Sequence, residues 1–350
     1  DYTIRELRFT VNANSNAANN SAAIATAVLK DGSTVVAGPI AYDSTNNYFK
    51  FDGLSIPVAK NTNKVLTLAF NLSSAVSSTT STSQVDVQPT QSYIKYMDAQ
   101  GTETESSTTY NPNKEVYVHK SIPTITEINV TNSALQNNSA VNVYSVKVAA
   151  DAAGSVSMKQ LKFALTWDDS AGSGSTLLLY GFKLFKDGVD ITSLVGITDE
   201  DGHNLETSTA AAGASETSAH AIVTFATEDV IAAGESTTYV LQATPSGFNA
   251  ADSDEGADGF SIKLASDSSV NTSTKKYLNA SAVPATSVVQ LATSAGASGA
   301  DANIIWSDNS AVSHASTVSA NGATATSSGD WSNGYLVKSV SSFSGEAFSR

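Results

Sequence analysis

The feature that most constrains the fold is an internal repeat, because two parts of the chain carry similar segments in the same order. The matching pairs are Ile4–Phe9 with Met158–Phe163, Ala27–Gly32 with Lys183–Gly188, and Val116–Ile122 with Tyr335–Val340. Ordered matches of this kind indicate two copies of one structural unit. Residues 123–157 precede the shared segment in the second copy, whereas only residues 1–3 precede it in the first. The first copy therefore lacks the front of the unit.

The hydrophobic pattern predicts β-strands in both copies. Leu7, Phe9 and Val11 alternate with polar residues, and Leu66–Leu72 has a similar period of two. Asp-Gly pairs interrupt apolar runs in both copies, which is a strong signal for tight hairpins. Many short strands separated by turns favour sandwiches over α/β folds. We therefore predict an all-β protein of two tandem immunoglobulin-like antiparallel β-sandwich domains, the first lacking its N-terminal strands.

The repeat also sets the expected domain boundaries. We place the first β-sandwich at residues 1–121, with its front truncated, and the second at residues 122–340, with acidic loop insertions. Residues 341–350 are then a C-terminal tail. Pro123 biases the residue before it toward an extended backbone, which predicts a short, stiff junction between the two domains.

The missing strands have a physical consequence in the first copy. A sandwich without its edge strands exposes apolar surface and a row of unpaired backbone groups. We expect this open edge beside the strand Ile4–Val11. Two kinds of segment could cover it: residues that precede Asp1 in a longer native chain, or a strand from a neighbouring chain, for example its residues 341–350.

Composition narrows the class of protein. The chain has no Cys, so its stability cannot depend on disulfides. Nineteen Lys and Arg against 33 Asp and Glu give 19 − 33 = −14, which argues against nucleic acid as a partner. No apolar run is long enough to span a membrane. Ser, Thr, Asn and Ala dominate and only 15% of residues are charged, a composition common among secreted proteins.

The sequence shows no catalytic motif. Its four His residues have no His-Glu-x-x-His spacing, and no Gly-x-Ser-x-Gly elbow is present. Ser and Asp are so common here that combinations resembling a catalytic triad arise by chance. We therefore expect a protein that is not an enzyme.

Two acidic loops are candidates for calcium binding. Asp252, Asp254 and Asp258 lie close together with Gly256 between the last two, and spaced carboxylates of this kind can wrap a Ca²⁺ ion. Asp199 and Asp201 form a similar but shorter pattern. Neither loop matches the full helix–loop–helix signature, and Asp and Gly also favour solvated turns. Both interpretations, a calcium site and an acidic turn, are open at this point.

Aromatic side chains offer a different kind of site. The candidates for stacking on sugar rings are Trp167, Trp306, Trp331, Tyr42 and Tyr48. Each lies in or beside an expected strand, where core packing is the simpler role. A cell-surface glycan is therefore the ligand to expect if these residues are exposed.

The segments Asn303–His314, Asp330–Lys338 and Val118–Thr124 resemble parts of long, repetitive, immunoglobulin-like surface (S-layer-like) proteins of ultra-small uncultivated bacteria. Asn303–His314 and Asp330–Lys338 are similar to a closing segment of those proteins, and Val118–Thr124 is similar to the joint between their repeats. The resemblance implies a secreted, immunoglobulin-like, repetitive protein and brings no catalytic residues. It also implies a longer chain before Asp1.

These observations predict a non-catalytic extracellular structural protein at the cell surface. It would be a subunit of a surface layer or filament that associates with neighbouring copies through β-strand or edge contacts. The alternative is a monomeric adhesin or carbohydrate-binding module. Assembly contacts would favour the first function, and an exposed aromatic cleft would favour the second.

Overall fold

The structure is a computed structural model of the chain. It describes residues 1–12, 24–72, 85–110, 116–131, 134–168, 177–199, 203–207, 212–213, 220–250, 257–267, 302–310, 314, 331–337 and 339–350. The described residues form β-strands and three short 3-10 helices, and they contain no α-helix. They divide into two compact units: Asp1–Lys120 with Ser310–Val312, and Ser121–Asn309 with Ser313–Arg350.

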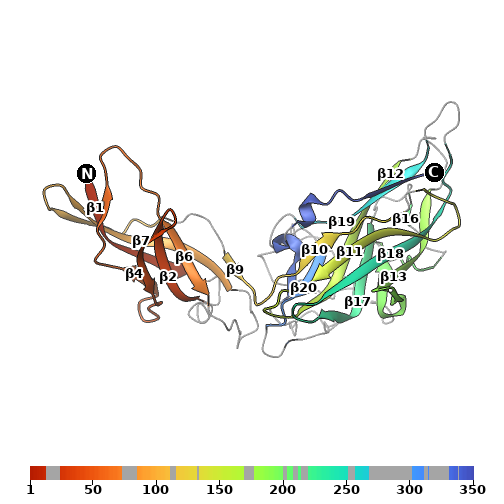
Figure 1. The fold of residues 1–350 in the computed structure, drawn as a ribbon, viewed down its shortest axis with the longest axis horizontal. Helices are drawn as coiled ribbons and strands as arrows, with labels where there is room; N and C mark the ends of the chain where they lie inside the picture. The colour runs from red at the N-terminus through yellow and green to blue at the C-terminus, as the bar shows by residue number, and fades with distance from the viewer. Residues whose placement is uncertain are drawn as a thin grey trace. The chain divides into compact units, whose positions relative to one another are not determined.

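The first unit is a sandwich of two antiparallel sheets (Figure 1). Its strands are β1 (Tyr2–Asn12), β2 (Ile24–Asp31), β3 (Thr34–Ile40), β4 (Tyr48–Phe51), β5 (Ile56–Val58), β6 (Thr67–Leu72), β7 (Val85–Asp98), β8 (Glu103–Ser106) and β9 (Val116–Val118). One sheet has the order β4-β1-β7-β8, with β5 also paired to β1 and β9 to β7. The other has the order β3-β2-β6.

Alternating apolar residues fill the space between these two sheets. Leu7, Phe49 and Phe51 are buried on the larger sheet, and Ala27 and Leu29 are buried on the smaller one. The rings of Phe49 and Phe70 lie 5.6 Å apart across the interface between the sheets. The period of two in the sequence therefore builds the core of the first unit as expected.

The second unit is a larger antiparallel sandwich. Its elements are β10 (Thr124–Glu127), β11 (Val141–Ala149), β12 (Val156–Asp168), β13 (Leu178–Lys186), β14 (Val189–Asp190), η2 (Thr192–Leu194), β15 (Val195–Thr198), β16 (Ala212–Gly213), β17 (His220–Ile231), β18 (Ser236–Ser246), β19 (Gly259–Leu264), β20 (Ile304–Ser307), β21 (Trp331–Asn333), η3 (Gly334–Leu336), η4 (Val340–Ser342) and β22 (Glu346–Ser349). One sheet has the order β10-β11-β18-β13-β14, with β16 on β13, and the facing sheet has the order β15-β17-β12-β19-β22, with β20 between β12 and β21.

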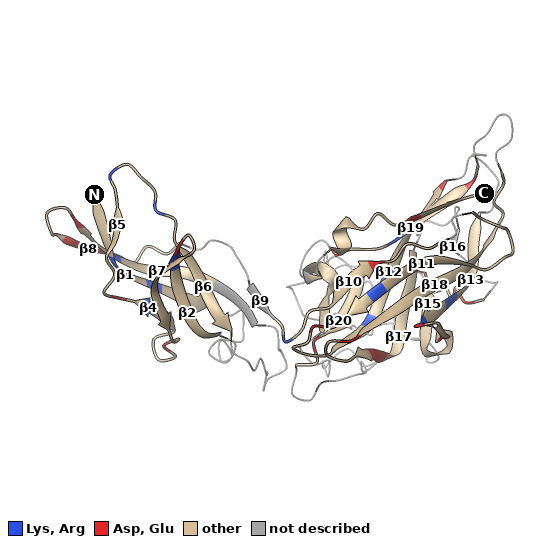
Figure 2. Ribbon diagram, in the orientation of Figure 1, with Lys and Arg blue, Asp and Glu red and all other residues tan. Residues whose placement is uncertain are grey.

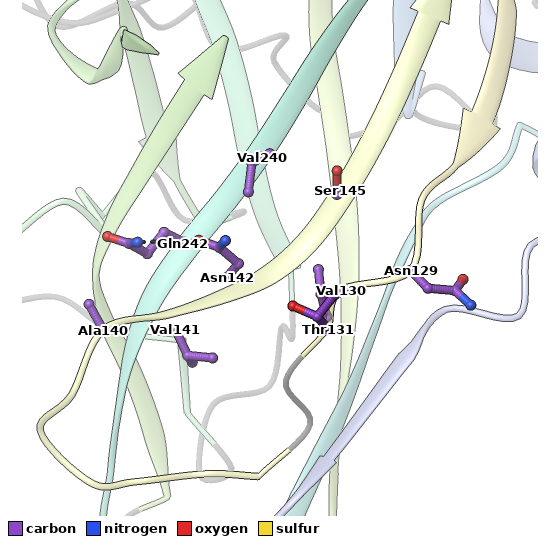
Figure 3. A pocket seen from close by; sticks show the side chains of 9 residues that line it. All are labelled: Asn129, Val130, Thr131, Ala140, Val141, Asn142, Ser145, Val240 and Gln242. Atoms are coloured by element: carbon purple, nitrogen blue, oxygen red, sulfur yellow. Dashed lines mark hydrogen bonds between the residues drawn. The ribbon is translucent and has the colours of Figure 1, made fainter. Parts of the chain in front are cut away.

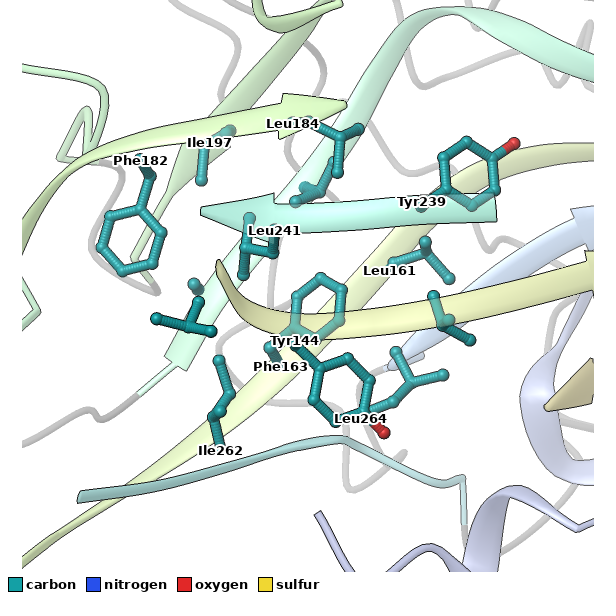
Figure 4. Packing of buried hydrophobic residues seen from close by; sticks show 14 of the residues in the cluster. Tyr144, Leu161, Phe163, Phe182, Leu184, Ile197, Tyr239, Leu241, Ile262 and Leu264 are labelled. Carbon is teal, nitrogen blue, oxygen red and sulfur yellow. The ribbon is translucent and has the colours of Figure 1, made fainter. Parts of the chain in front are cut away.

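The core of the second unit joins large side chains from both sheets (Figure 4). Tyr144 on β11 meets Phe163 on β12 edge to face, with ring centroids 5.4 Å apart. Leu184 and Leu241 pack beside them from β13 and β18. Burial of such side chains stabilises a fold by about 1.5–3 kcal/mol each, so this core is the main source of stability of the unit.

The pairing registers reproduce the repeat seen in the sequence. Leu7 faces Phe51 in the first unit as Leu161 faces Val223 in the second. In the facing sheets, β2 pairs with β6 as β13 pairs with β18. The predicted fold class is therefore confirmed: the chain is all-β, with two immunoglobulin-like antiparallel sandwiches, and the described part of the first has no counterpart of β10 and β11.

The C-terminal region differs from the sequence analysis in two respects. Residues 341–350, expected to be a tail, contain β22, which pairs with β19 and buries Phe348 against Phe260. The segment expected to match the strand Val116–Val118 begins instead with the 3-10 helix η3. The carboxylate of Asp267 accepts the backbone N–H of Gly334, and the side chain of Asn333 accepts that of Tyr335, so local hydrogen bonds favour the turn over a strand.

Candidate functional site: an open strand edge and a polar hollow

The strand predicted to have an open edge, Ile4–Val11, lies inside its sheet. Strand β1 pairs with β4 and β5 on one side and with β7 on the other. The prediction of an open edge beside Ile4–Val11 is therefore wrong. The second unit shows why, because β10 and β11 belong to the sheet that faces β12, not to the sheet that contains it. Loss of such strands opens the facing sheet.

Strand β6 of the first unit is the strand that would pair with a counterpart of β11. In the second unit, β18 lies between β13 and β11. In the first unit, β6 is the counterpart of β18 and pairs with β2, but no described strand occupies its other side. Among the described strands, β6 is therefore an edge strand of its sheet.

Burial of the side chains differs between these two strands. The core-facing residues Tyr239 and Leu241 of β18 are each 1% exposed. On β6, Leu68 and Phe70 contact the core but are only partly buried, and Leu72, which pairs with the buried Ile24, is 52% exposed. The inner face of β6 therefore continues into an uncovered apolar strip.

The same difference appears on the opposite wall of the sandwich. Phe163 is 1% exposed because Tyr144 of β11 lies against its ring. Its counterpart in the repeat is Phe9, which contacts Phe51 at a ring distance of 6.0 Å and is only partly buried. We call the strip formed by Phe9, Phe70 and Leu72 with the free edge of β6 the acceptor strip.

The acceptor strip lacks the usual protection of an edge strand. Edge strands commonly carry charges, proline or bulges that prevent pairing with another chain. The other edge of the same sheet, β3, contains Pro39 and has two irregularities in its pairing with β2. In the facing sheet, β8 carries Glu103 and Glu105. Strand β6 has six residues with no charge and no proline (Figure 2).

The second unit contains a separate polar hollow of about 390 Å³ on the sheet that includes β11 and β18 (Figure 3). Its polar side chains are Asn129, Thr131, Asn142, Ser145 and Gln242. The Gln242 amide donates a hydrogen bond to the Asn142 side chain at 3.2 Å. Amides and hydroxyls of this kind can exchange hydrogen bonds with sugar hydroxyls, but no aromatic ring lines the hollow.

The described residues do not bring the predicted calcium ligands together. Asp252, Asp254 and Asp201 lie outside the described residues. Asp258 is buried, and its Oδ2 accepts the backbone N–H of Asn249 at 2.7 Å. Asp199 is also buried, and its two oxygens meet the backbone N–H and the Nδ1 of His203 at 2.8 and 2.7 Å. Among described residues, no group of three or more metal-ligating side chains forms.

The aromatic residues proposed as sugar platforms pack mainly into the protein. Trp306 and Trp331 are buried, and the Trp306 indole N–H donates to the carbonyl of Asn333 at 2.8 Å. Trp167 stacks near Phe248 and Phe260. Tyr42 contacts the core of the first unit. Tyr48 lies below the guanidinium of Arg8. Core packing therefore accounts for most of these rings.

One buried amine was not anticipated from the sequence. Lys159 is 1% exposed, and its Nζ donates to the carbonyl of Ala226 at 2.9 Å. Burial lowers the pKa of Lys159 to about 8, while the charge of Glu228 opposes that shift. Glu228 in turn binds the Nε2 of His314 at 2.7 Å. Strand β12 is buried on both faces from Val156 to Phe163, and its pairing is irregular between Met158 and Gln160, so the sequence pattern carries no signal for the burial of Lys159.

A second group of polar contacts links the turn at residues 344–345 to β10 and β11. The carboxylate of Glu127 accepts hydrogen bonds from the Tyr144 hydroxyl at 2.7 Å and from the backbone N–H of Gly345 at 2.9 Å. The hydroxyl and N–H of Ser344 also donate to it. Burial of the Tyr144 hydroxyl, followed by its bond to Glu127, raises the pKa of Tyr144 above its ordinary value. These contacts are specific to the strands that the first unit lacks.

No protein-family model matches the sequence, and no curated protein sequence matches it. Two crystal structures of BcpA, the major pilin subunit of Bacillus cereus, are similar over 73% and 69% of this chain, each at 12% identity, with TM-scores of 0.23 and 0.20. The chain spans about 60% of the length of that pilin. A serine-rich repeat protein from Streptococcus agalactiae is similar over 76% of this chain and 78% of its own, at 12% identity and a TM-score of 0.18.

These TM-scores are low, so neither fold nor function is carried over from the three structures. No helix in the described part of the chain is long and apolar enough to cross a membrane.

Proposed function

We propose that the chain is a non-catalytic, extracellular structural protein, a subunit of a surface layer or filament that associates through strand edges. The observation that carries the proposal is the difference between β6 and β18: β11 pairs with the outer edge of β18 in the second unit, whereas no described strand pairs with the corresponding edge of β6. An open edge with an apolar inner face is a site for the addition of a strand from another molecule. An edge used in this way joins different surfaces of two subunits, and such contacts build open polymers whenever the rotation between subunits does not close a ring.

The character of the rest of the chain supports this function. Cores built from β-strands, together with a low share of charged residues and abundant Ser, Thr and Asn, suit a stable extracellular scaffold. The resemblance to repetitive surface proteins of ultra-small bacteria points to the same location, at the cell surface.

The test is the size of the particles that the chain forms in solution, measured by light scattering during gel filtration and by electron microscopy. The variant Leu72→Lys places a charge in the acceptor strip at a position that is already half exposed, so folding is retained. The matched control is Val36→Lys on β3, the opposite edge of the same sheet. We expect the parent chain and the control to form oligomers and Leu72→Lys to remain monomeric. Monomers of the parent chain at every concentration, or unchanged oligomers of Leu72→Lys, would overturn the proposal.

A second candidate function is that of an adhesin that binds a cell-surface glycan. The polar hollow favours it, because five amide and hydroxyl side chains line it. The double variant Asn142→Ala, Gln242→Ala removes the hydrogen-bonded amide pair. Loss of binding on a glycan array in this variant, with oligomers of normal size, would support the adhesin. An array without bound glycan for the parent chain would count against it.

A further inference from the structure

We infer that the polar hollow of the second unit binds the uncharged end of a glycan, a pyranose ring that presents two adjacent hydroxyl groups to Asn142 and Gln242. This inference rests on the adhesin candidate of the proposed function, names its ligand class, and is independent of any association through β6. The hollow measures about 390 Å³, which is within the range of small-molecule binding sites.

The wall of the hollow is the segment that follows β10. This segment stays beside β11 up to Ile128, whose N–H donates to the carbonyl of Ser145 at 2.9 Å. The N–H of Val130 then donates to the carboxylate of Glu346 at 3.0 Å rather than to a carbonyl of β11. The hollow lies between residues 129–131 and the strands β11 and β18 (Figure 3). Its wall is therefore held in place by hydrogen bonds on both sides.

The floor of the hollow is shaped by a β-bulge in β11. The register against β18 shifts between Asn142 and Tyr144, after which Ser145 pairs with Val240. In a regular strand, residues three apart point to opposite faces, so the bulge is what allows Asn142 and Ser145 to line the same hollow. Ser145 is only 6% exposed and is the most buried of the five polar residues there. The hollow is thus built by an irregularity of the sheet.

The amide pair supplies the contact that selects the ligand. The Nε2 of Gln242 donates to the Oδ1 of Asn142 at 3.2 Å, which orients both side chains. The Asn142 amide keeps its N–H donors, and the Gln242 amide keeps its carbonyl acceptor. Turning both amides over leaves the same complement, one donor group beside one acceptor. Two adjacent hydroxyls of a pyranose match this pair, because each hydroxyl both donates and accepts.

The distribution of charge selects an uncharged sugar. None of the nine described residues that line the hollow is charged. Lys147 of β11 and Lys183 of β13 lie outside this lining, and Lys183 is 3.8 Å from the carboxylate of Asp190. The carboxylate of Glu346 is bonded to the wall, and the whole chain carries a net charge of −14. An anion therefore finds no cation among the lining residues, and an apolar ligand would leave the amides unpaired.

The experiment measures binding of four neutral sugars to the full chain: the methyl glycosides of glucose, galactose, mannose and N-acetylglucosamine. Saturation-transfer NMR detects this binding whether or not the chains associate. Because no ring stacks on the sugar, we expect a Kd on the order of 1 mM for at least one of them. The uronic acid form of the sugar that binds should bind roughly tenfold more weakly, since its carboxylate meets no cation. Absence of binding by all four sugars, or tighter binding of the acid, would overturn the inference.

Variants test whether the sugar occupies the hollow. Asn142→Ala and Gln242→Ala should each weaken binding by roughly tenfold, since each removes a hydrogen bond to the ligand. The double variant should lose little more than either single one, because the two amides act as one contact. Thr238→Ala, on β18 but outside the hollow, is the matched control and should bind like the parent. Equal binding by the double variant and the parent would overturn the hollow as the site.

Failure of this inference and failure of the adhesin function give different results. Array binding that survives in the double variant would place the glycan site elsewhere and overturn the hollow, while the adhesin function stands. Binding of a methyl glycoside that is lost in the double variant, without retention of any glycan on the array, would support the hollow and contradict the adhesin. The oligomer measurement for the surface-layer function uses no sugar and is independent of both results.

Discussion

The two units share one strand arrangement and differ in how completely it is closed. Among the described residues, the buried apolar cluster of the second unit has 35 members, and that of the first has nine. The walls are the same: β1 corresponds to β12, and β2 with β6 corresponds to β13 with β18. This difference shows that β10 and β11, which belong to one sheet, also decide how deeply residues of the facing sheet are buried, since Tyr144 of β11 covers Phe163 of β12.

The largest expected effect is the unequal cost of removing the same ring from the two units. Phe163→Ala should reduce the free energy of unfolding by about 3–5 kcal/mol, because it leaves a cavity in a closed core. Phe9→Ala should cost only about 1–2 kcal/mol, since the ring is partly exposed already. Denaturant unfolding of the full chain, followed by fluorescence, gives the loss of unfolding free energy for each variant. Val36→Lys is the surface control. Equal costs would mean that the first unit is closed in solution.

Much of this arrangement could be predicted from the sequence, and one essential part could not. The alternation around Leu7 and Phe9 and the repeated Asp-Gly pairs gave the strands and the two sandwiches. The open edge was assigned to β1 because consecutive strands usually pair. The chain instead crosses from one sheet to the other between β11 and β12, and period-two patterns carry no information on that crossing. The polar hollow depends on side chains far apart in the sequence, so no local motif could mark it.

The next largest expected effect is the change of unfolding free energy with pH that the buried Lys159 causes. Lys159 is buried in the second unit, whereas its counterpart in the first unit, Arg5, is partly exposed. The folded-state pKa of Lys159 is about 8 against an ordinary value of 10.5. The unfolded chain therefore holds a proton that the folded chain releases between these pH values. Stability from this group is complete above pH 10.5 and is lost as the pH falls to about 8.

Lys159→Met should remove this dependence on pH and raise the free energy of unfolding at pH 7 by up to about 3 kcal/mol. The measurement is urea unfolding between pH 7 and pH 10. Lys147→Met, an exposed site on β11, is the matched control and should keep the slope of the parent chain. If the unfolding free energy of Lys159→Met changed with pH as steeply as that of the parent chain, burial of Lys159 would not be the cause of the pH dependence.

A smaller effect is expected from the contacts that only the more complete unit possesses. Tyr144→Phe keeps the ring against Phe163 and removes the hydroxyl that donates to Glu127. The carboxylate keeps its bonds from Ser344 and Gly345, so the loss should be about 1–2 kcal/mol. Hydrogen exchange of β22 should increase with it, because Glu127 holds the turn before that strand. A neutral effect on both measurements would show that the hydroxyl is solvated equally well in the unfolded chain.

The smallest expected effect tests whether the acidic loops make the second unit a calcium-binding one. Carboxylates at Asp252, Asp254 and Asp258 occur only in that unit, and residues 77–83 of the first are all Ser or Thr. For a weak extracellular type of site, with a Kd on the order of 1 mM, 1 mM calcium adds about 0.4 kcal/mol by mass action. The melting temperature of the second unit should therefore rise slightly, and Asp254→Asn should cancel the rise while leaving the buried carboxylate of Asp258 and its bond to Asn249 intact. Magnesium at the same concentration controls for ionic strength, because it demands a smaller, near-octahedral coordination sphere than calcium does. Identical melting with calcium, magnesium or a chelator would assign the acidic residues to solvated turns, and the two units would then differ only in how their sandwiches are closed.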